Sequence, residues 1–171
     1  SKIAKNIKLF RSHGILRNKK KHWEYDVLRH GFNYRLSDIN CALALSQLKK
    51  INFFMKKRKN IYQNYLRRFK NFSQFIRFPK YSKDIIPSYH LFLLNISFKK
   101  LKKNKNNFMK FLKRKNIFVQ QHYIPIYKFS IYKKQTINFS GAEKFFNNSI
   151  SLPIFVNLSK IDQNKVIKEI K

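Results

Sequence analysis

Apolar residues recur every three or four positions over most of the first seventy residues, a spacing typical of helices with one buried face. Residues 2–10 follow this pattern, and we expect the first helix to end near Gly14, since glycine adopts a left-handed C-cap without strain. Ser37 is the expected N-cap of a second helix that runs to about Lys50. That helix is apolar around most of its circumference, which predicts burial on more than one side. A third helix, residues 53–69, has one apolar stripe and predicts one-sided packing.

The stretch from Ile15 to His30 interrupts this helical pattern. It is rich in basic and aromatic residues and shows no period of either two or 3.6 residues. We therefore predict a long loop between the first two helices.

The pattern changes after about residue 70. Short apolar runs predict strands at 75–78, 89–96 and 117–123, and periodic segments predict helices at 104–115, 139–150 and 159–170. Ser159 and Asp162 have the spacing of a capping box at the start of the last helix. The order β-β-α-β-α-α predicts a small α/β domain over residues 70–171, and we expect the lysine-rich run 99–105 to be a solvated loop.

The amino-acid composition indicates a packed core and shows a large positive net charge. The chain has 171 residues, of which 43% are hydrophobic, enough for a packed core, and its 39 Lys and Arg against 7 Asp and Glu give a formal net charge of +32. Such a charge suggests nucleic acid, an anionic membrane or a polyanionic substrate as partner. A second explanation is a compositional bias toward Lys, Asn, Ile and Phe, because the charge is spread along the whole chain.

The cysteine content and the lengths of the apolar runs bear on the cellular compartment of the protein. Cys41 is the only cysteine, so no disulfide is expected, and a reducing, cytoplasmic compartment fits. No apolar run approaches the ~18 residues of a membrane-spanning helix, so we expect no membrane association. The chain begins at Ser1 within a helical pattern, and we expect the protein to continue upstream.

The segment 31–45, GFNYRLSDINCALAL, joins a polar turn to a helix. It resembles the G-Y-N-Y-R-x-S-x-I-x-A-A-L segment of the DegT/DnrJ/StrS family of pyridoxal-phosphate-dependent nucleotide-sugar aminotransferases. Four further segments resemble family motifs in the expected order: residues 9–14 (x-R-x-H-G), 89–91 (W-H-L), 122–125 (H-Y-x-P) and 151–153 (S-L-P). Five ordered matches argue against chance. Within the family, residues 11–14, 89–91 and 47–50 are most similar to the branch that makes a precursor of pseudaminic acid.

The resemblance implies a fold and an activity. It implies an α/β, fold-type-I transferase, with residues 1–69 as the C-terminal part of the large domain, including a dimer-interface helix, and 70–171 as the small C-terminal domain. The complete enzyme would be a homodimer with active sites shared across the interface. It would use pyridoxal 5'-phosphate to move an amino group from glutamate to the C4 keto group of a UDP-linked 4-keto-6-deoxy sugar, in the biosynthesis of pseudaminic acid or a surface polysaccharide.

The resemblance also assigns roles at the turn. It implies that Asn33 binds the cofactor phosphate of the neighbouring subunit, and an amide that donates to phosphate in front of a helix N-terminus suits that role. The alternative is that Asn33 only supplies a turn conformation after Gly31. Arg35 is a candidate substrate ligand through bidentate binding of phosphate or carboxylate, or else forms a salt bridge with Asp38 or a partner chain.

Further substrate contacts are implied elsewhere. The basic and aromatic stretch corresponds to a family segment near the nucleotide sugar, which makes Lys21 and Trp23 candidates together with Lys19, Lys20, His22 and Tyr25, although an inert surface loop is the alternative. His13, His122 and Tyr123 are also candidates, whereas His122 could instead pack under the sheet. His90 is expected to be structural.

Some chemistry is not assigned. The lysine that holds the cofactor as a Schiff base lies before the R-x-H-G motif in the family, as do the ring-stacking residue and the Asp that pairs with the pyridine nitrogen. We therefore expect this chain to be inactive alone. No metal site is expected, because His13, His90 and His122 lie in separate elements.

The rival hypothesis is a small basic nucleic-acid-binding protein, such as a ribosome-associated factor. It would explain the charge directly. It leaves the five ordered motifs unexplained, and the sequence has no helix-turn-helix, RRM or zinc-finger signature. We therefore expect no specific nucleic-acid partner.

Overall fold

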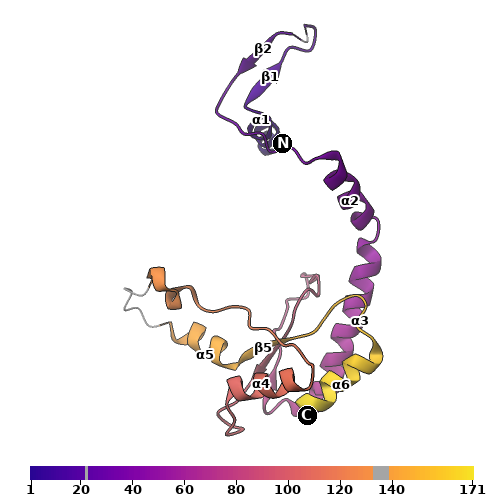
Figure 1. Cartoon of the computed structure of the whole chain (residues 1–171), viewed down its shortest axis with the longest axis vertical. Coiled ribbons are helices and arrows are strands. Elements are labelled where there is room, and N and C mark those ends of the chain that lie inside the picture. The colour runs from indigo at the N-terminus through magenta and orange to yellow at the C-terminus, as the bar shows by residue number, and fades with distance from the viewer. Residues whose placement is uncertain (22, 133–138) are drawn as a thin grey trace. The chain divides into compact units, whose positions relative to one another are not determined.

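The structure is a computed structural model that describes residues 1–21, 23–132 and 139–171. Its residues form two compact units, an N-terminal unit, Ser1–Lys50, and a C-terminal unit, Ile51–Lys171. Figure 1 labels most helices and strands of both units. Each unit is described by itself below.

The N-terminal unit begins with helix α1 (Lys2–Arg11), as the apolar spacing predicts. Ser1 caps its start, and the chain leaves the helix through His13 and Gly14, which have φ values of 60° and 70°. The N–H of Gly14 donates to the carbonyl of Leu9 over 2.7 Å. The expected left-handed C-cap at Gly14 is therefore confirmed.

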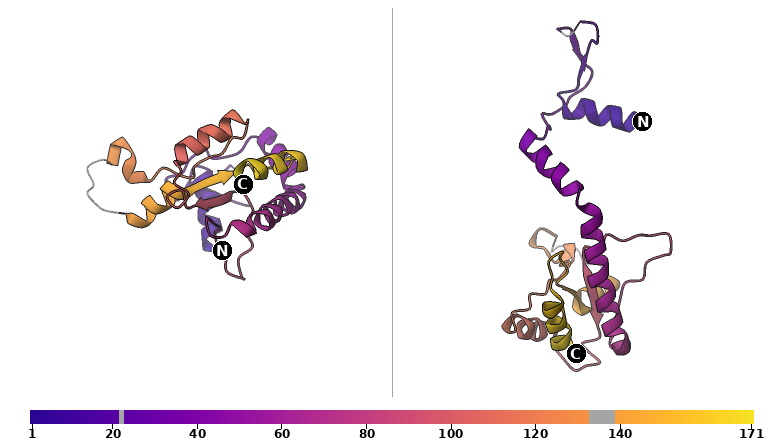
Figure 2. Two further views of the ribbon diagram at one scale, coloured as in Figure 1. Left: turned by 90° about the horizontal axis from the view of Figure 1, so that it is seen from below. Right: turned by 90° about the vertical axis from the view of Figure 1, so that its right-hand side faces the viewer.

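The stretch from Ile15 to His30 was predicted to be a loop, and this prediction is wrong in part. It contains an antiparallel hairpin of β1 (Ile15–Arg17) and β2 (Tyr25–Val27), with Leu16 opposite Asp26. Figure 2 shows the hairpin leaving the C-terminal end of α1. Each strand has only three residues and the hairpin side chains are mostly exposed, so no apolar alternation marks them in the sequence.

Helix α2 (Asp38–Leu48) ends the N-terminal unit, and Ser37 caps it by accepting a hydrogen bond from the N–H of Asn40. Its start and cap agree with the prediction. None of its residues is buried within this chain: Ile39, Leu43, Leu45 and Leu48 are at least 59% exposed. Among the described residues of this unit only Gly14 is buried, so the unit has no core of its own.

The C-terminal unit is a layered α/β domain. Its elements in order are α3 (Ile51–Phe69), the 3₁₀ turn η1 (Lys70–Phe72), β3 (Ile76–Arg77), β4 (Phe92–Ile96), α4 (Lys105–Arg114), the 3₁₀ turns η2 (Ile126–Lys128) and η3 (Ser130–Tyr132), α5 (Ser140–Asn148), β5 (Ser149–Leu152) and α6 (Lys160–Ile170). The strands form one antiparallel sheet in the order β3-β4-β5.

The core of this unit lies where α3 and α6 pack against the sheet. Phe92 of β4 is fully buried, and its ring centroid lies 4.7 Å from that of Tyr65 and 4.8 Å from that of Tyr62, both on α3. The buried Gln163 of α6 donates to the carbonyl of Ile61 over 2.8 Å and ties the two helices together. The Tyr65 hydroxyl donates to the carbonyl of Pro153, and burial raises the pKa of Tyr65 far above its usual value.

One predicted element of this unit is wrong, and another ends two residues earlier than expected. Residues 117–123 form no strand; only Gln120 makes an isolated bridge, to Ser151. The predicted helix 139–150 ends at Asn148, and Ser149–Leu152 is instead the third strand of the sheet. The observed order is therefore β-β-α-α-β-α. The cap at Ser159 is confirmed, since Ser159 Oγ accepts from the N–H of Asp162 over 3.0 Å, but the reciprocal half of the capping box differs: the Asp162 carboxylate accepts from the Ser159 hydroxyl over 2.6 Å.

The run 99–105 is only partly the solvated loop that we expected. Lys105 is the first residue of α4, and its ammonium donates to the carbonyl of Phe146 and lies 4.5 Å from the centre of that ring. The accompanying burial lowers the pKa of Lys105.

The boundary between the two units falls between Lys50 and Ile51. The change of apolar pattern along the sequence had predicted a domain boundary near residue 70. The physical reason is α3, whose apolar stripe of Ile61, Tyr62, Tyr65 and Phe69 is buried in the C-terminal core. The domain assignment of 1–69 and 70–171 concerns a longer protein, and it stays a prediction.

Candidate functional site

Segment 28–34 crosses the end of α1 and thereby positions Asn33. The N–H of Phe32 donates to the carbonyl of Phe10 over 2.8 Å, and the N–H of Tyr34 donates to the carbonyl of Arg11 over 2.9 Å. These bonds pair Asn33 with Ser12 in an isolated antiparallel bridge.

Two glycines make this close crossing possible. A Cβ atom on Gly14 would lie 1.8 Å from the carbonyl oxygen of Arg29, and one on Gly31 would lie 2.2 Å from the backbone nitrogen of Gly14. Side chains cannot fit at either distance, so glycine is needed at both positions.

The side chains of Asn33 and Arg35 are joined. The Nε atom of Arg35 donates to Oδ1 of Asn33 over 2.9 Å. Both side chains are exposed, and none of the ion pairs within the described ranges includes Arg35, so the alternative salt bridge with Asp38 is not formed here. The terminal nitrogens of Arg35 and the amide NH₂ of Asn33 remain as donors.

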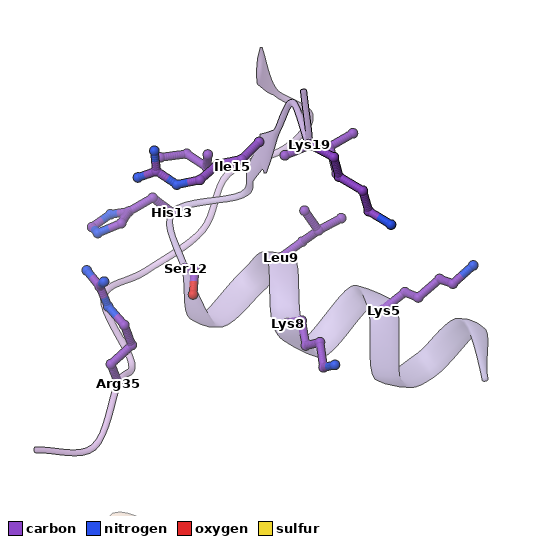
Figure 3. Close-up of a pocket in the computed structure, with 10 residues that line it drawn as sticks. Lys5, Lys8, Leu9, Ser12, His13, Ile15, Lys19 and Arg35 are labelled. Atoms are coloured by element: carbon purple, nitrogen blue, oxygen red, sulfur yellow. The ribbon is translucent and has the colours of Figure 1, made fainter. Parts of the chain in front are cut away.

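Arg35 and His13 line a common pocket of about 740 Å³ beside α1 (Figure 3). We call it the α1–hairpin pocket, and its lining residues are Lys5, Lys8, Leu9, Ser12, His13, Ile15, Leu16, Arg17, Lys19 and Arg35. Its volume lies within the range of small-molecule sites. The structure thus brings together His13 and Arg35, two of the predicted substrate ligands, and joins Asn33 to them through Arg35.

Lys21 and Trp23 lie on the hairpin but do not line this pocket. The Lys21 ammonium forms an ion pair with Glu24 over 2.8 Å, and both groups are exposed. The Trp23 side chain is 66% exposed. His22, which lies between them, is outside the described residues.

His122 and Tyr123 lie in the C-terminal unit, in the segment before η2. Nδ1 of His122 is 2.7 Å from the hydroxyl oxygen of Ser151, which is buried on β5. The neighbouring Gln121 donates its amide to the carbonyl of Phe146 over 3.0 Å. These two contacts fix the backbone next to Tyr123, whose side chain is 72% exposed and free to meet a ligand.

The chain beyond Tyr123 is tied to helix α5. Glu143 accepts a hydrogen bond from the Tyr127 hydroxyl over 2.9 Å and pairs with the Lys128 ammonium over 2.8 Å. The bonds from Lys128 and Tyr127 lower the pKa of Glu143. Turn η2 is therefore held in place by the carboxylate of Glu143, which stays ionised at a lower pH than an ordinary glutamate.

His90 is exposed and lies before strand β4, and it has a partner on α3; its structural role stays a prediction. Its Nδ1 lies 2.9 Å from a terminal nitrogen of Arg58 on α3. An arginine can only donate, so Nδ1 of His90 is the acceptor of this bond.

Several contacts at these sites escaped the sequence analysis. Ser151 and Gln121, which hold the His122 segment, are distant in sequence from their partners, His122 and Phe146, so only the fold brings them together. Lys5 and Lys8 could have been noticed, since they lie one turn apart on an expected helix.

Neither a cluster of metal ligands nor a membrane-spanning helix is present in the described residues. Within residues 1–21, 23–132 and 139–171, no three His, Cys, Asp or Glu residues are grouped as metal ligands. In the same residues, no helix is long and apolar enough to cross a membrane.

Comparison with known proteins identifies the family. The DegT/DnrJ/EryC1/StrS aminotransferase family matches over residues 1–171. The UDP-4-amino-4,6-dideoxy-N-acetyl-beta-L-altrosamine transaminase of Campylobacter jejuni is 36% identical over 171 residues, covering 98% of this chain and 44% of that protein. The Helicobacter pylori transaminase of the same name is 38% identical over 161 residues, covering 93% of this chain and 42% of that protein.

A solved structure agrees. Helicobacter pylori PseC, an aminotransferase involved in the biosynthesis of pseudoaminic acid, superposes with a TM-score of 0.83 at 32% identity, over 99% of this chain and 45% of that one. The chain therefore spans less than half the length of these relatives. The family match over its whole length decides its relationship: this chain belongs to the DegT/DnrJ/EryC1/StrS aminotransferase family.

Proposed function

We propose that this chain is the C-terminal portion of a pyridoxal-phosphate-dependent aminotransferase that aminates the C4 keto group of a UDP-linked 4-keto-6-deoxy sugar, with glutamate as amino donor. The enzyme would act in the cytoplasm, in pseudaminic acid or surface-polysaccharide biosynthesis. Residues 1–69 would complete the large domain and 70–171 would form the small domain. Two named transaminase relatives at 36% and 38% identity support the substrate class.

The observation that carries the proposal is the bond between Arg35 and Asn33. Because Nε of Arg35 can only donate, the atom of Asn33 that it meets must be the amide oxygen. The amide NH₂ then faces away as a donor. A donor beside a guanidinium, both exposed, fits a phosphate group of the cofactor or substrate.

The cofactor, when bound, would carry the amino group between the donor and the sugar. The part of this chain would be to hold and orient. Asn33 would donate to the cofactor phosphate of the partner subunit, across the interface of a homodimer. The exposed apolar side chains of α2 support an interface there, because contiguous exposed apolar surface marks an interaction site.

The nucleotide sugar would contact several groups of this chain. Arg35 and His13 would bind polar groups of the substrate, and Lys21 and Trp23 offer a charge and an aromatic face on the hairpin. In the C-terminal unit, His122 is fixed by Ser151 while the exposed phenol ring of Tyr123 is free to pack against the substrate. Binding at fixed side chains costs less ordering entropy than binding at mobile ones.

The nucleic-acid-binding alternative has no support in the comparisons, since this chain belongs to an aminotransferase family over its full length. The net charge alone favours no defined RNA or DNA.

The direct test is to assay the complete enzyme and these 171 residues separately, with glutamate, pyridoxal phosphate and a UDP-4-keto-6-deoxy sugar. We expect amination by the complete enzyme and none by the 171 residues, because the lysine that holds the cofactor would lie elsewhere. Two results would contradict the proposal: stoichiometric, borohydride-trappable labelling of one lysine in the 171 residues, or a complete enzyme that aminates no nucleotide sugar.

A further inference from the structure

Residues 121–128, which we call the 121–128 segment, are anchored at both ends. At the first end, the amide of Gln121 donates to the carbonyl of Phe146 in the last turn of α5 over 3.0 Å. Nδ1 of His122 lies 2.7 Å from the hydroxyl oxygen of the buried Ser151 on β5. The segment therefore begins in fixed contact with both α5 and the sheet.

The other end of the 121–128 segment is bound by one carboxylate. Glu143, in the first turn of α5, accepts a hydrogen bond from the Tyr127 hydroxyl over 2.9 Å and pairs with the Lys128 ammonium over 2.8 Å. The ring of Tyr127 also stacks on that of Phe139, with centroids 4.9 Å apart. Glu143 thus ties two consecutive residues to the helix that also holds the first end.

The charge of Glu143 is a scarce feature in this chain. Seven of the 171 residues are Asp or Glu, against 39 Lys and Arg. Its distance of 2.8 Å to Lys128 is shorter than the 3.8 Å between Glu169 and Lys115 in the same unit. The bonds from Lys128 and Tyr127 lower the pKa of Glu143. The carboxylate is therefore ionised at neutral pH and attracts Lys128 by charge as well as by hydrogen bonding.

Exposed apolar side chains lie between the two anchors. Tyr123, Ile124 and Ile126 are 72%, 49% and 65% exposed. Pro125 lies among them with a φ of −56°, and its ring stiffens the backbone there because it locks this angle. The segment therefore presents Tyr123 from a backbone that is ordered before any ligand binds.

This order affects the free energy of binding. A ligand that contacted Tyr123 on a mobile segment would first have to order that segment, and the lost conformational freedom would weaken its binding. With both ends anchored, folding has already ordered the segment. Removal of one anchor should therefore weaken the binding of such a ligand without removing any of the ligand's own contacts.

We propose that Glu143 is a positioning residue for the sugar substrate. By binding Tyr127 and Lys128, it holds the 121–128 segment where Tyr123 meets the nucleotide sugar. It thereby sets the affinity for the sugar but not for the amino donor. The inference rests on the proposed function, in which Tyr123 packs against the substrate.

Steady-state kinetics of the complete enzyme test this role, with the UDP-4-keto-6-deoxy sugar and glutamate varied in turn. Glu143→Gln removes the charge that pairs with Lys128 and should raise KM for the sugar about tenfold, the usual scale for a hydrogen bond to a charged group. It should change kcat and KM for glutamate less than about twofold, the pattern of lost substrate binding. The matched control is Glu169→Gln, which removes the carboxylate paired with Lys115 and should change KM for the sugar less than about twofold.

Charge reversal shows whether the pair itself matters. Glu143→Lys and Lys128→Glu each place like charges opposite one another, so each single variant should raise KM for the sugar at least as much as Glu143→Gln does. The double variant restores an ion pair of opposite polarity and should bring KM back to within about threefold of the wild-type value. A purely structural role of either side chain would give no such recovery.

Three results would overturn the inference and leave the proposed function standing: an active Glu143→Gln enzyme with unchanged KM for the sugar, an equal rise in KM for glutamate or with Glu169→Gln, or no recovery in the double variant. A complete enzyme that aminates no nucleotide sugar would overturn both. Circular dichroism compares the helix content of each variant with the wild type. If Glu143→Gln fails to fold, Tyr127→Phe removes one bond, keeps the ring against Phe139 and should raise KM for the sugar about threefold or more; an unchanged KM would again overturn the inference.

Discussion

The Nε atom of Arg35 lies 2.9 Å from Oδ1 of Asn33, two residues earlier in the chain. This single bond decides which end of the Asn33 amide is free, because guanidinium nitrogens never accept. The free end is the NH₂ group, a donor suited to phosphate. Segment 28–34 holds Asn33 through backbone bonds to the last turn of α1, and Arg35 follows directly after it.

Replacing Asn33 tests this donor. In the complete enzyme, Asn33→Ala should weaken cofactor retention about ten- to a hundredfold, because it removes a hydrogen bond to a charged group worth roughly 1.5–3 kcal/mol. Equilibrium dialysis with pyridoxal phosphate measures the change. Asn60→Ala, at an exposed position of α3, is the matched control and should leave retention unchanged. Retention that is equal in both variants would remove Asn33 from the cofactor site.

The glycine crossing predicts a second pair of variants. Gly14→Ala places a Cβ atom 1.8 Å from the Arg29 carbonyl at a residue with φ of 70°, whereas a Cβ on Gly141 meets nothing within 4 Å. We expect Gly14→Ala to cost at least about 2 kcal/mol of stability, while Gly141→Ala changes it by less than about 1 kcal/mol. Thermal unfolding of the complete enzyme compares the two. A Gly14→Ala enzyme as stable as its parent would mean that the close crossing is absent.

The two units should differ in hydrogen exchange when the 171-residue chain is studied alone. In the N-terminal unit only Gly14 is buried among the described residues, whereas the C-terminal unit contains the whole buried cluster around Phe92. Amide protection follows local stability, so we expect slow exchange in α3, β4, β5 and α6 and fast exchange in α1 and α2. Mass spectrometry of peptic peptides measures both. Protection of α2 equal to that of β4 would show that α2 is covered within this chain or by a second copy.

Phe92 anchors the C-terminal core. Its side chain is fully buried against Tyr62, Tyr65 and Phe78, so Phe92→Ala should destabilise the C-terminal unit by about 3–5 kcal/mol. Ile161→Ala, at a site that is 82% exposed on α6, should cost less than about 0.5 kcal/mol. Urea unfolding of the 171-residue chain, followed by circular dichroism, gives both values. Similar losses would mean that the core is packed differently.

Helices and their caps could be predicted from the sequence because their signals are local. Ser37 and Ser159, the two expected caps, each lie one residue before a helix and accept a backbone hydrogen bond there. The apolar stripe of α3 was also recognisable, but its partner was not. The burial of this stripe in the C-terminal core depends on tertiary contacts, which local sequence patterns do not reveal.

Strands were predicted less well, because whether a segment forms a strand depends on its hydrogen bonding to a neighbouring strand. Residues 117–123 are as apolar as many strands, yet only Gln120 bridges to β5, while Ser149–Leu152 pairs along its length with β4. The buried serines of β5 made it resemble the end of a helix. The short hairpin of β1 and β2 is mostly exposed and had no apolar alternation to reveal it.

The candidate site could be located in part. The family resemblance pointed to Asn33 and Arg35, and the structure joins them by a hydrogen bond. It also gathers His13 with Arg35 at one pocket, which sequence spacing could not show because 22 residues separate them. The contact of His122 with Ser151 likewise depends on the fold.

The role of Asn33 across a dimer interface is the central claim, and subunit mixing tests it most directly. Asn33→Ala subunits are mixed with subunits that lack the lysine holding the cofactor, and subunit exchange is verified. If Asn33 acts in the partner's site, each mixed dimer has one site with its own lysine and an intact Asn33. The assay uses a cofactor concentration that saturates the wild type but not the Asn33→Ala dimers, so that each parent alone has little activity. With half of the dimers mixed, we expect about a quarter of wild-type amination activity. Exchange without recovery of activity would mean that Asn33 serves its own subunit, and would contradict the account.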